Sequence, residues 1–298
     1  MAYFGWHVST SGSWANMPLV AHDANADTFA FFPRPPRGGS LRTLDMDDID
    51  KLLQHLHDFH FGPLVAHAPY VYNLAAQAEG IRERSLNNMR EDIDRLEIIA
   101  AKHPVYYNFH PGAHTGQGRH IGINKIIDAL NDIIQPNQKT IVLLETMAGK
   151  GTEIGSNFDE LEQIIDGVTH DDRIGICLDT CHTHDAGMSI ATDFDSVLNE
   201  LEAVCGPSRL CAIHLNDSKN TCGSKKDRHE RLGHGTIGLE AIKQIVCNPR
   251  VSNLPFILET PNDFDGYAVE IELLHKMISG EPLEELQSFL MDKQVISA

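Results

Sequence analysis

The sequence predicts a single α/β domain that closes into a (β/α)8 barrel, also called a TIM barrel. Eight short apolar runs alternate with amphipathic segments along the 298 residues, the pattern of repeated strand and helix units around a parallel sheet. No Pro/Gly-rich linker is long enough to divide the chain. No G-x-G-x-x-G motif follows the first run, as an open dinucleotide-binding sheet would require. We therefore expect one domain over residues 1–298.

The candidate strands are short, mostly apolar runs bounded by polar or turn-forming residues. In chain order they cover residues 3–7, 28–32, 63–67, 105–109, 140–145, 174–179, 210–214 and 255–259. The segment PRPPRGG, which runs from Pro33 to Gly39, is short and follows the second strand. We expect it to be a loop.

The candidate helices show apolar residues at a period near 3.6. In the first of them Ile49, Leu52 and Leu56 fall on one face, and Asp45 is placed to cap the first turn. This helix is expected over residues 46–59. Further helices are expected over residues 86–99, 123–134, 158–168, 194–204, 239–247 and 268–278, with a short C-terminal helix near 283–291 after Pro282.

The amino-acid composition excludes some classes of binding partner. The 24 Lys and Arg residues against 42 Asp and Glu residues give a formal net charge of −18, which excludes a generic cationic nucleic-acid binder. Six cysteines and no secretory leader favour a reducing, cytoplasmic location. No run of about 18 apolar residues predicts a membrane span. We expect a monomer with no membrane partner.

Seven of the eight predicted strands end at or beside a residue that can bind a metal ion. In a (β/α)8 barrel all C-terminal strand ends meet on one face, where the active site lies. Residues far apart in the sequence therefore become neighbours there. The seven strand-end residues are His7, His67, His110, Glu145, Asp179, His214 and Glu259.

Two local motifs add candidate ligands. In LDTCHTHDAG, His182 lies three residues after Asp179, so the two side chains can reach neighbouring points. In DRHERLGHG, Asp227 and His229 form an i, i+2 pair that faces one way in an extended segment. Imidazole and carboxylate together suit zinc, and also manganese or iron. Cys181, by contrast, is expected to be a small filler.

Six segments occur in an order that resembles the endonuclease IV family of apurinic/apyrimidinic DNA endonucleases. They are VAHAPYVYNLA, NFHPGAHTG, LLETMAGKGTEIG, GICLDTCHTHDAG, HLNDSK and DRHERLGHGTIG. The resemblance runs over residues 5–261, nearly the whole chain. It implies a metal-dependent phosphodiesterase that cuts double-stranded DNA 5′ to abasic sites, leaves a 3′-hydroxyl and trims blocked 3′ ends.

The resemblance also implies three zinc ions per chain, and all nine matching positions carry the expected residue type. The first ion would be held by His67, His110 and Glu145; the second by Glu145, Asp179, His214 and Glu259; the third by His182, Asp227 and His229. Glu145 would bridge the first two ions, and Glu259 could also orient or deprotonate the attacking water. Manganese or iron would suit some positions. His7 is not a family ligand, and we expect it to support one.

Three divalent ions and four liganding carboxylates leave the site at about +2, so an acidic chain can still attract a phosphate there. The matching regions place Arg34 or Arg37 and Tyr70 near the DNA gap, and an abasic nucleotide is easier to rotate out of the helix than an intact one. Phosphate contacts are expected from Lys150, Lys219, Lys225, Lys226, Arg228 and Arg231. Ligand-supporting hydrogen bonds are expected from His114, His120, His184 and His234.

Two rival interpretations stay open. Sugar isomerases and epimerases of the related barrel type also place Glu, Asp, His and Glu on strands five to eight, with one or two metal ions. A noncatalytic metal-binding or DNA-binding protein is the other alternative. The residues that a small-sugar enzyme does not need are His67, His110, His182, Asp227 and His229.

Overall fold

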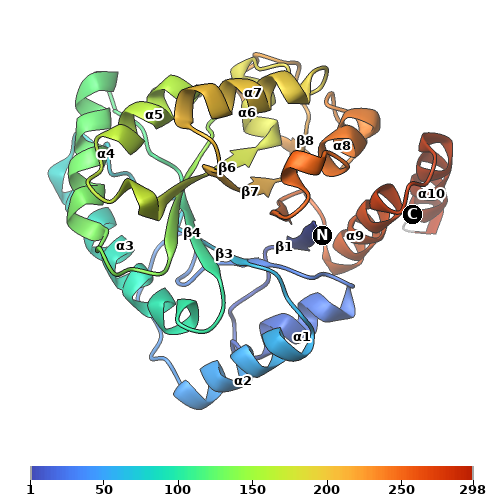
Figure 1. Cartoon of the computed structure of the whole chain (residues 1–298), viewed down its shortest axis with the longest axis horizontal. Coiled ribbons are helices and arrows are strands. Elements are labelled where there is room, and N and C mark those ends of the chain that lie inside the picture. The colour runs from blue at the N-terminus through green and yellow to red at the C-terminus, as the bar shows by residue number, and fades with distance from the viewer. Residues whose placement is uncertain (1, 297–298) are drawn as a thin grey trace.

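The computed structural model describes residues 2–296, and its centre is an eight-stranded parallel sheet rolled into a barrel (Figure 1). The strand order is β1-β10-β7-β6-β5-β4-β3-β2, and a parallel bridge between His7 and Ala30 joins the two end strands. The strands are β1 (Tyr3–Trp6), β2 (Ala30–Phe31), β3 (Leu64–His67), β4 (Val105–Phe109), β5 (Ile141–Glu145), β6 (Ile174–Asp179), β7 (Leu210–His214) and β10 (Pro255–Leu258). The predicted (β/α)8 barrel is confirmed.

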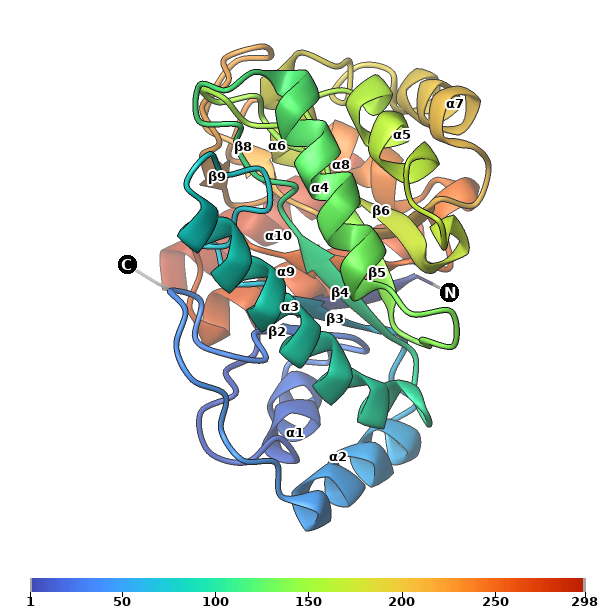
Figure 2. The ribbon, with the colours of Figure 1, turned by 90° about the vertical axis from the view of Figure 1, so that its left-hand side faces the viewer.

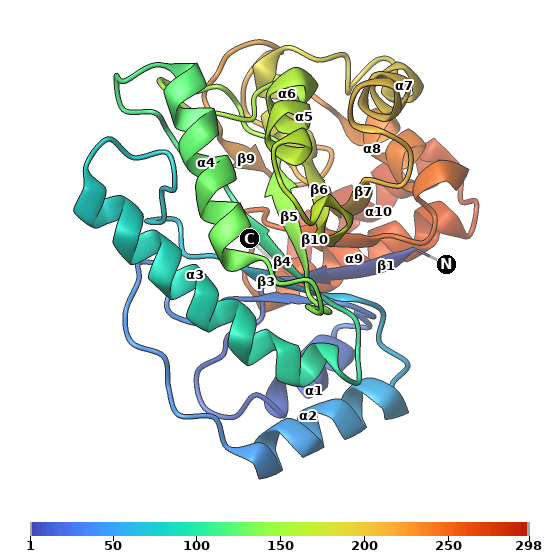
Figure 3. The same ribbon diagram turned by 60° about the vertical axis from the view of Figure 1, so that its left-hand side comes forward.

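A ring of helices covers the outside of the barrel (Figures 1 and 3). Each predicted helix is present, as α2 (Met46–Asp58), α3 (Glu79–Ala100), α4 (Arg119–Ile133), α5 (Phe158–Asp166), α7 (Phe194–Cys205), α8 (Leu239–Val246), α9 (Phe264–Ile278) and α10 (Leu283–Ile296). Of these, α3, α4 and α9 begin before their expected first residues, 86, 123 and 268, and α10 continues past residue 291. The last of these packs against α9. Among residues 2–296 no helix is both long and apolar enough to cross a bilayer.

Local sequence explains where α2 begins and which face it buries. The Asp45 side chain accepts a hydrogen bond from the amide of Asp47 and so caps the first turn. Ile49, Leu52 and Leu56 are buried against the barrel, as their spacing predicts.

The sequence analysis did not predict two of the α-helices, α1 (Asn16–Asp23) and α6 (Thr180–Ala186). The reason is clear for α6, because the residues from Thr180 to Asp185 are all buried. These buried residues are nearly all polar, so the helix has no apolar face and gives no amphipathic period.

The interior of the barrel explains where the polar strand ends lie. A cluster of buried residues fills it, namely Ala30, Val65, Leu143, Cys177, Ala212 and Ile257. Side chains two residues apart in a strand point to the same face. Two positions beyond the members on β3, β5, β6, β7 and β10 come His67, Glu145, Asp179, His214 and Glu259. These five side chains form the next inward layer, at the C-terminal mouth of the barrel.

A short antiparallel ribbon extends the loop after β7. It consists of β8 (Asp217–Ser218) and β9 (His229–Glu230), which pair Ser218 with His229. The ribbon lies beside α6 (Figure 2). It brings the segment with Asp227 and His229 to the mouth of the barrel.

Candidate metal centre

The structure brings the nine predicted ligands together in three of five overlapping groups of potential metal ligands among residues 2–296. Within each group the potential ligand atoms lie within 4.8 Å of one another. The groups are His67, His110 and Glu145; Glu145, Asp179, His214 and Glu259; and His182, Asp227 and His229. These are the same three sets that the sequence resemblance implies, with Glu145 shared by the first two.

Glu145 lies at the centre and is fully buried. Its Oε2 lies 3.3 Å from Nε2 of both His67 and His110, whereas its Oε1 lies 3.2 Å from Nδ1 of His214. Burial alone would raise the pKa of this carboxyl, but the imidazoles of His214 and His110 outweigh burial and hold the pKa well below its usual value. An ionised carboxylate with each oxygen facing a different group is suited to bridging two cations.

The third group includes a residue from α6 and two from the ribbon segment. Asp227 Oδ1 lies 3.1 Å from His182 Nε2 and 3.6 Å from His229 Nε2. Burial opposes ionisation of Asp227, but His182 and His229 outweigh it and lower the pKa to about 2. Asp179 Oδ2 lies 3.8 Å from His229 Nε2 and so links this group to the second one.

The histidines are oriented so that one ring nitrogen faces its group. Nδ1 of His67 donates to the carbonyl of Ala68 over 2.7 Å, and Nδ1 of His229 donates to the carbonyl of Glu259 over 3.2 Å. These bonds leave Nε2 of both rings buried without a hydrogen-bond partner. Buried polar atoms seldom stay unpaired, and a backbone bond to the far nitrogen is typical of metal-binding histidine. The residues present therefore fit metal ions.

Two asparagines support the carboxylates, and sequence analysis missed both. Asn108 donates to Glu145 Oε2 over 2.6 Å. Asn216 donates to Asp179 Oδ2 over 2.7 Å and accepts the amide of Glu259 over 2.8 Å. The available signal was a polar side chain inside or just after an apolar strand, in VYYNF and HLND.

His7 lies where the sequence analysis expected, beside a ligand. Its Nε2 is 2.7 Å from Glu259 Oε1, and the two groups form a hydrogen bond. The expected supporting role of His7 therefore agrees with its position.

The cysteines near the mouth are not needed as ligands. The thiol of Cys181 can approach Asp179 and His229, but burial raises its pKa well above the usual value. Burial likewise raises the pKa of Cys177 to about 11, and that residue lies in the interior cluster. Thiols kept protonated are poor metal ligands, because the thiolate is the binding form.

Arg34 is not available to DNA in this structure, which corrects one expectation. Its side chain is buried, and Nε donates to Asp92 Oδ1 over 2.8 Å. Its Nη2 also donates to Glu91 Oε2 over 3.0 Å. The loop can bury this residue because Asp92 of α3 supplies a buried countercharge. Arg37 of the same loop is exposed.

Tyr70 lies over the first group. The centre of its ring is 5.3 Å from that of His67 and 5.8 Å from that of His110, while 54% of the residue stays exposed. The predicted cationic contacts are all exposed, on the loops after β5 and β7: Lys150, Lys219, Lys225, Lys226, Arg228 and Arg231.

Three other histidines were expected to form hydrogen bonds to ligands, but in the structure their rings bond elsewhere. His114 Nδ1 accepts the amides of Gly116 and Gly118, and the rings of His120 and His184 form hydrogen bonds with Asn124 and Thr236. These bonds shape the loops around the centre instead.

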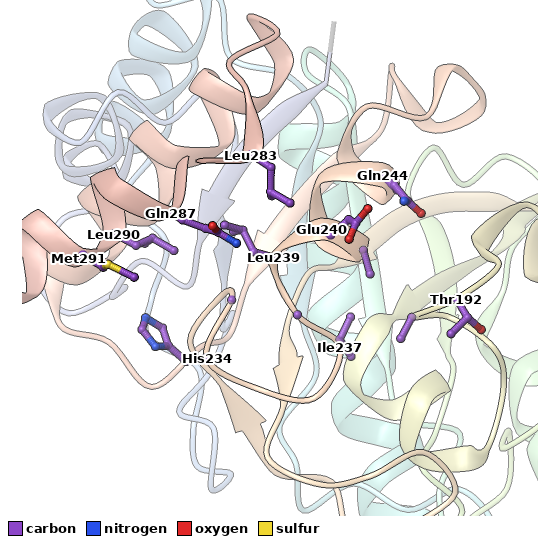
Figure 4. A pocket seen from close by; sticks show the side chains of 14 residues that line it. Thr192, His234, Ile237, Leu239, Glu240, Gln244, Leu283, Gln287, Leu290 and Met291 are labelled. Carbon is purple, nitrogen blue, oxygen red and sulfur yellow. The ribbon is translucent and has the colours of Figure 1, made fainter. Parts of the chain in front are cut away.

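A cavity of about 950 Å³ lies between α8 and α10, apart from the metal centre (Figure 4). Leu239, Gln287 and Leu290 line it, and His234 lies at its edge. None of the nine predicted ligands lines this cavity. The candidate chemistry therefore does not take place there.

The fold and site define an α/β-barrel protein of the xylose isomerase-like type. Residues 19–277 match the family model described as a xylose isomerase-like TIM barrel. A D-tagatose 3-epimerase-like protein shares the fold, with a TM-score of 0.66 at 17% identity over 93% of this chain and 98% of that one.

Two nearer relatives are nucleases by name. The probable endonuclease 4 of Clostridium beijerinckii is 48% identical over 92% of this chain and 98% of its own length. Endonuclease IV from Thermus thermophilus superposes with a TM-score of 0.81 at 28% identity, over 94% of this chain and 100% of that one. The chain belongs to the endonuclease IV family and is a nuclease.

Proposed function

We propose that this protein is a DNA repair endonuclease that hydrolyses the phosphodiester 5′ to abasic sites in double-stranded DNA. The products would be a 3′-hydroxyl and a 5′-deoxyribose phosphate. The observation that carries the proposal is the convergence of nine His, Asp and Glu side chains into three adjoining groups, two of which share Glu145. Membership of the endonuclease IV family supports it.

Zinc is the metal we propose for all three groups, and manganese or iron also suits such ligands. Bound ions would supply an activated water and positive charge beside the phosphate, the two requirements of phosphodiester hydrolysis. The third group argues against a small-sugar isomerase, because proton transfer on a sugar gives His182, Asp227 and His229 no task.

Glu259 is suited to orient the attacking water. Burial alone would raise the pKa of its carboxyl, but His214 and His7 outweigh burial and hold the pKa well below its usual value. His7 fixes Oε1 through the 2.7 Å bond, and Oε2 lies 3.1 Å from His214 Nδ1. A carboxylate held this rigidly is suited to orient a water molecule, whereas its lowered pKa makes it a weak proton acceptor.

Lesion recognition would come from the rim. The exposed ring of Tyr70 lies over the first group, where it could fill the space left by a missing base. Arg37 on its exposed loop would enter the DNA gap beside it. The exposed cations Lys150, Lys219, Lys225 and Arg228 would contact phosphates, and rotating out an abasic nucleotide costs less than rotating out an intact one.

The same centre would trim blocked 3′ ends, because these present a similar phosphate. We propose that the protein acts on chromosomal DNA within the cell, as a monomer.

A duplex with one abasic analogue tests the proposal. Incubation with zinc-loaded protein should give one cut 5′ to the lesion with a 3′-hydroxyl, and a chelator should abolish the cut. The matching intact duplex and a ketose substrate serve as controls for lesion specificity and for isomerase activity. Uncut lesion DNA with full metal occupancy would refute the assigned activity.

A further inference from the structure

Asp185 on α6 is a fully buried carboxylate whose side-chain hydrogen bonds go to the segment that carries Asp227 and to the adjacent strand β8. Its Oδ2 accepts the backbone amides of Asp227 over 2.8 Å and of Lys226 over 3.3 Å. Its Oδ1 accepts the hydroxyl of Ser218 over 2.7 Å, and its backbone carbonyl accepts the amide of Lys225 over 2.9 Å. One residue thus binds three consecutive amides and the adjacent ribbon.

The segment that Asp185 binds has an unfavourable backbone conformation. Lys225 has φ of 55° and Asp227 has φ of 57°, in the left-handed region that residues other than glycine rarely adopt. Such a conformation persists only where surrounding contacts hold it. The amide of Lys225 donates to the backbone carbonyl of Asp185 and the amide of Asp227 donates to its carboxylate, and these bonds are contacts of the required kind.

The spacing along α6 connects this clamp to the third group of ligands. His182 and Asp185 are three residues apart, so they lie on one face of the helix. His182 Nε2 lies 3.1 Å from the Asp227 carboxylate, while Asp185 binds the Asp227 amide. One turn of α6 therefore holds both the carboxylate and the backbone amide of Asp227.

We propose that Asp185 is a positioning residue that holds Asp227 in place and thereby sets the metal affinity of the His182–Asp227–His229 group. The inference rests on the proposed function, because it takes this group to bind a metal ion. A purely structural role would lower the stability of the whole fold instead. The positioning role acts on one group of ligands and leaves the first two unchanged.

The test compares Asp185→Ala and Asp185→Asn with wild type in the full chain. Zinc content and stepwise zinc affinity are measured in chelator-buffered zinc, together with kcat on the abasic duplex. Asp193→Ala is the matched control, because Asp193 also accepts a backbone amide, at the exposed start of α7. It should keep all three affinities.

For Asp185→Ala we expect the weakest zinc affinity to fall about tenfold to hundredfold, with the two others unchanged. Asp185→Asn should fall in between, since its amide oxygen can still accept the Asp227 amide. Retained binding of two ions shows that the alanine variant is folded. If the alanine variant does not fold, the test rests on Asp185→Asn. An unchanged weakest zinc affinity in that variant would then contradict the proposal.

Two outcomes for the variant overturn the inference. An unchanged third affinity in folded Asp185→Ala removes the positioning role, and an equal loss at all three groups replaces it with a general structural one. Wild type that binds fewer than three ions, or that leaves the abasic duplex uncut, refutes the proposed function itself. That result is seen without any variant, so the two failures are distinguishable.

Discussion

The side-chain amide of Asn108 donates a hydrogen bond to Oε2 of Glu145 over 2.6 Å, at the centre of the three ligand groups. Both residues are fully buried, and they lie on the neighbouring strands β4 and β5. Oε2 also faces His67 and His110, so Asn108 fixes the direction in which this oxygen presents its remaining electron pairs. The amide contributes orientation without being a ligand.

Replacing Asn108 with Leu should therefore impair the centre more than the fold. We expect kcat on abasic DNA to fall by about tenfold to hundredfold, as for other partners of metal-binding carboxylates. Stability should change less than activity, because the loss of the bond to Glu145 is partly offset by removal of Oδ1, a buried atom without a hydrogen-bond partner. Denaturation curves and single-turnover rates would check both parts. Full activity in the variant would show that Glu145 needs no such support.

Changing Glu145 to Gln should abolish cleavage and leave the fold largely intact. The amide keeps the size of the side chain but loses the negative charge that two groups of ligands share. His229→Asn should instead chiefly damage the third group, because His229 belongs to that group and not to the pair that shares Glu145. Cleavage assays and zinc content measure the two effects. Wild-type turnover by the Glu145 variant would remove the bridging role.

Arg34 and Arg37 should separate stability from DNA binding. Arg34→Ala leaves the buried Asp92 carboxylate without its ion pair, which should lower the free energy of unfolding by about 3–5 kcal/mol. Arg37→Ala removes an exposed side chain and should weaken binding of abasic DNA without destabilising the fold. Chemical denaturation and a DNA-binding titration measure the two properties. Equal stability losses in both variants would contradict this division.

The buried carboxyl of Glu270 should make the free energy of unfolding fall as the pH rises. Burial raises the pKa of its carboxyl from 4.5 to about 7, although bonds from Thr260 and from the Leu232 amide oppose the shift. Below pH 4.5 the group is protonated in both states. Between pH 4.5 and 7 the carboxyl releases its proton in the unfolded chain but keeps it in the folded protein. The free energy of unfolding therefore falls by about 3 kcal/mol over this range, and the fall is complete above pH 7.

Glu270→Gln should remove this part of the pH dependence, because its oxygen can still accept the Leu232 amide and nothing titrates. The free energy of unfolding of both proteins should be measured from pH 4 to pH 8. The difference between them should grow with pH in favour of the variant. Parallel profiles would show that the carboxyl is not protonated in the folded state at acid pH.

The strands and their ligands could be predicted from sequence for a common reason. An apolar run that ends in His, Asp or Glu marks a strand, and the alternation of side chains carries that final residue inward, as with Leu143 and Glu145. Barrel closure then turns separation along the chain into proximity. Asp227 and His229 were candidates from their i, i+2 spacing, but only the family resemblance grouped them with His182, because they lie on a loop and ribbon with no strong periodicity.

What sequence could not supply are contacts that depend on distant partners. Arg34 pairs with Asp92, a residue 58 positions later, so nothing within PRPPRGG indicates burial. Asn108 and Asn216 are common residue types, and only the folded barrel shows which carboxylate each one binds. The clamp by Asp185 depends on left-handed backbone at Lys225 and Asp227, which non-glycine sequence does not predict.

The metal content of the zinc-loaded, desalted protein tests the central claim most directly. Three ligand groups that share one bridging carboxylate predict close to three ions per chain by elemental analysis. Removal of the three bound ions by a chelator should abolish cleavage. One ion per chain, or none, in folded protein that still cuts abasic DNA would contradict the account.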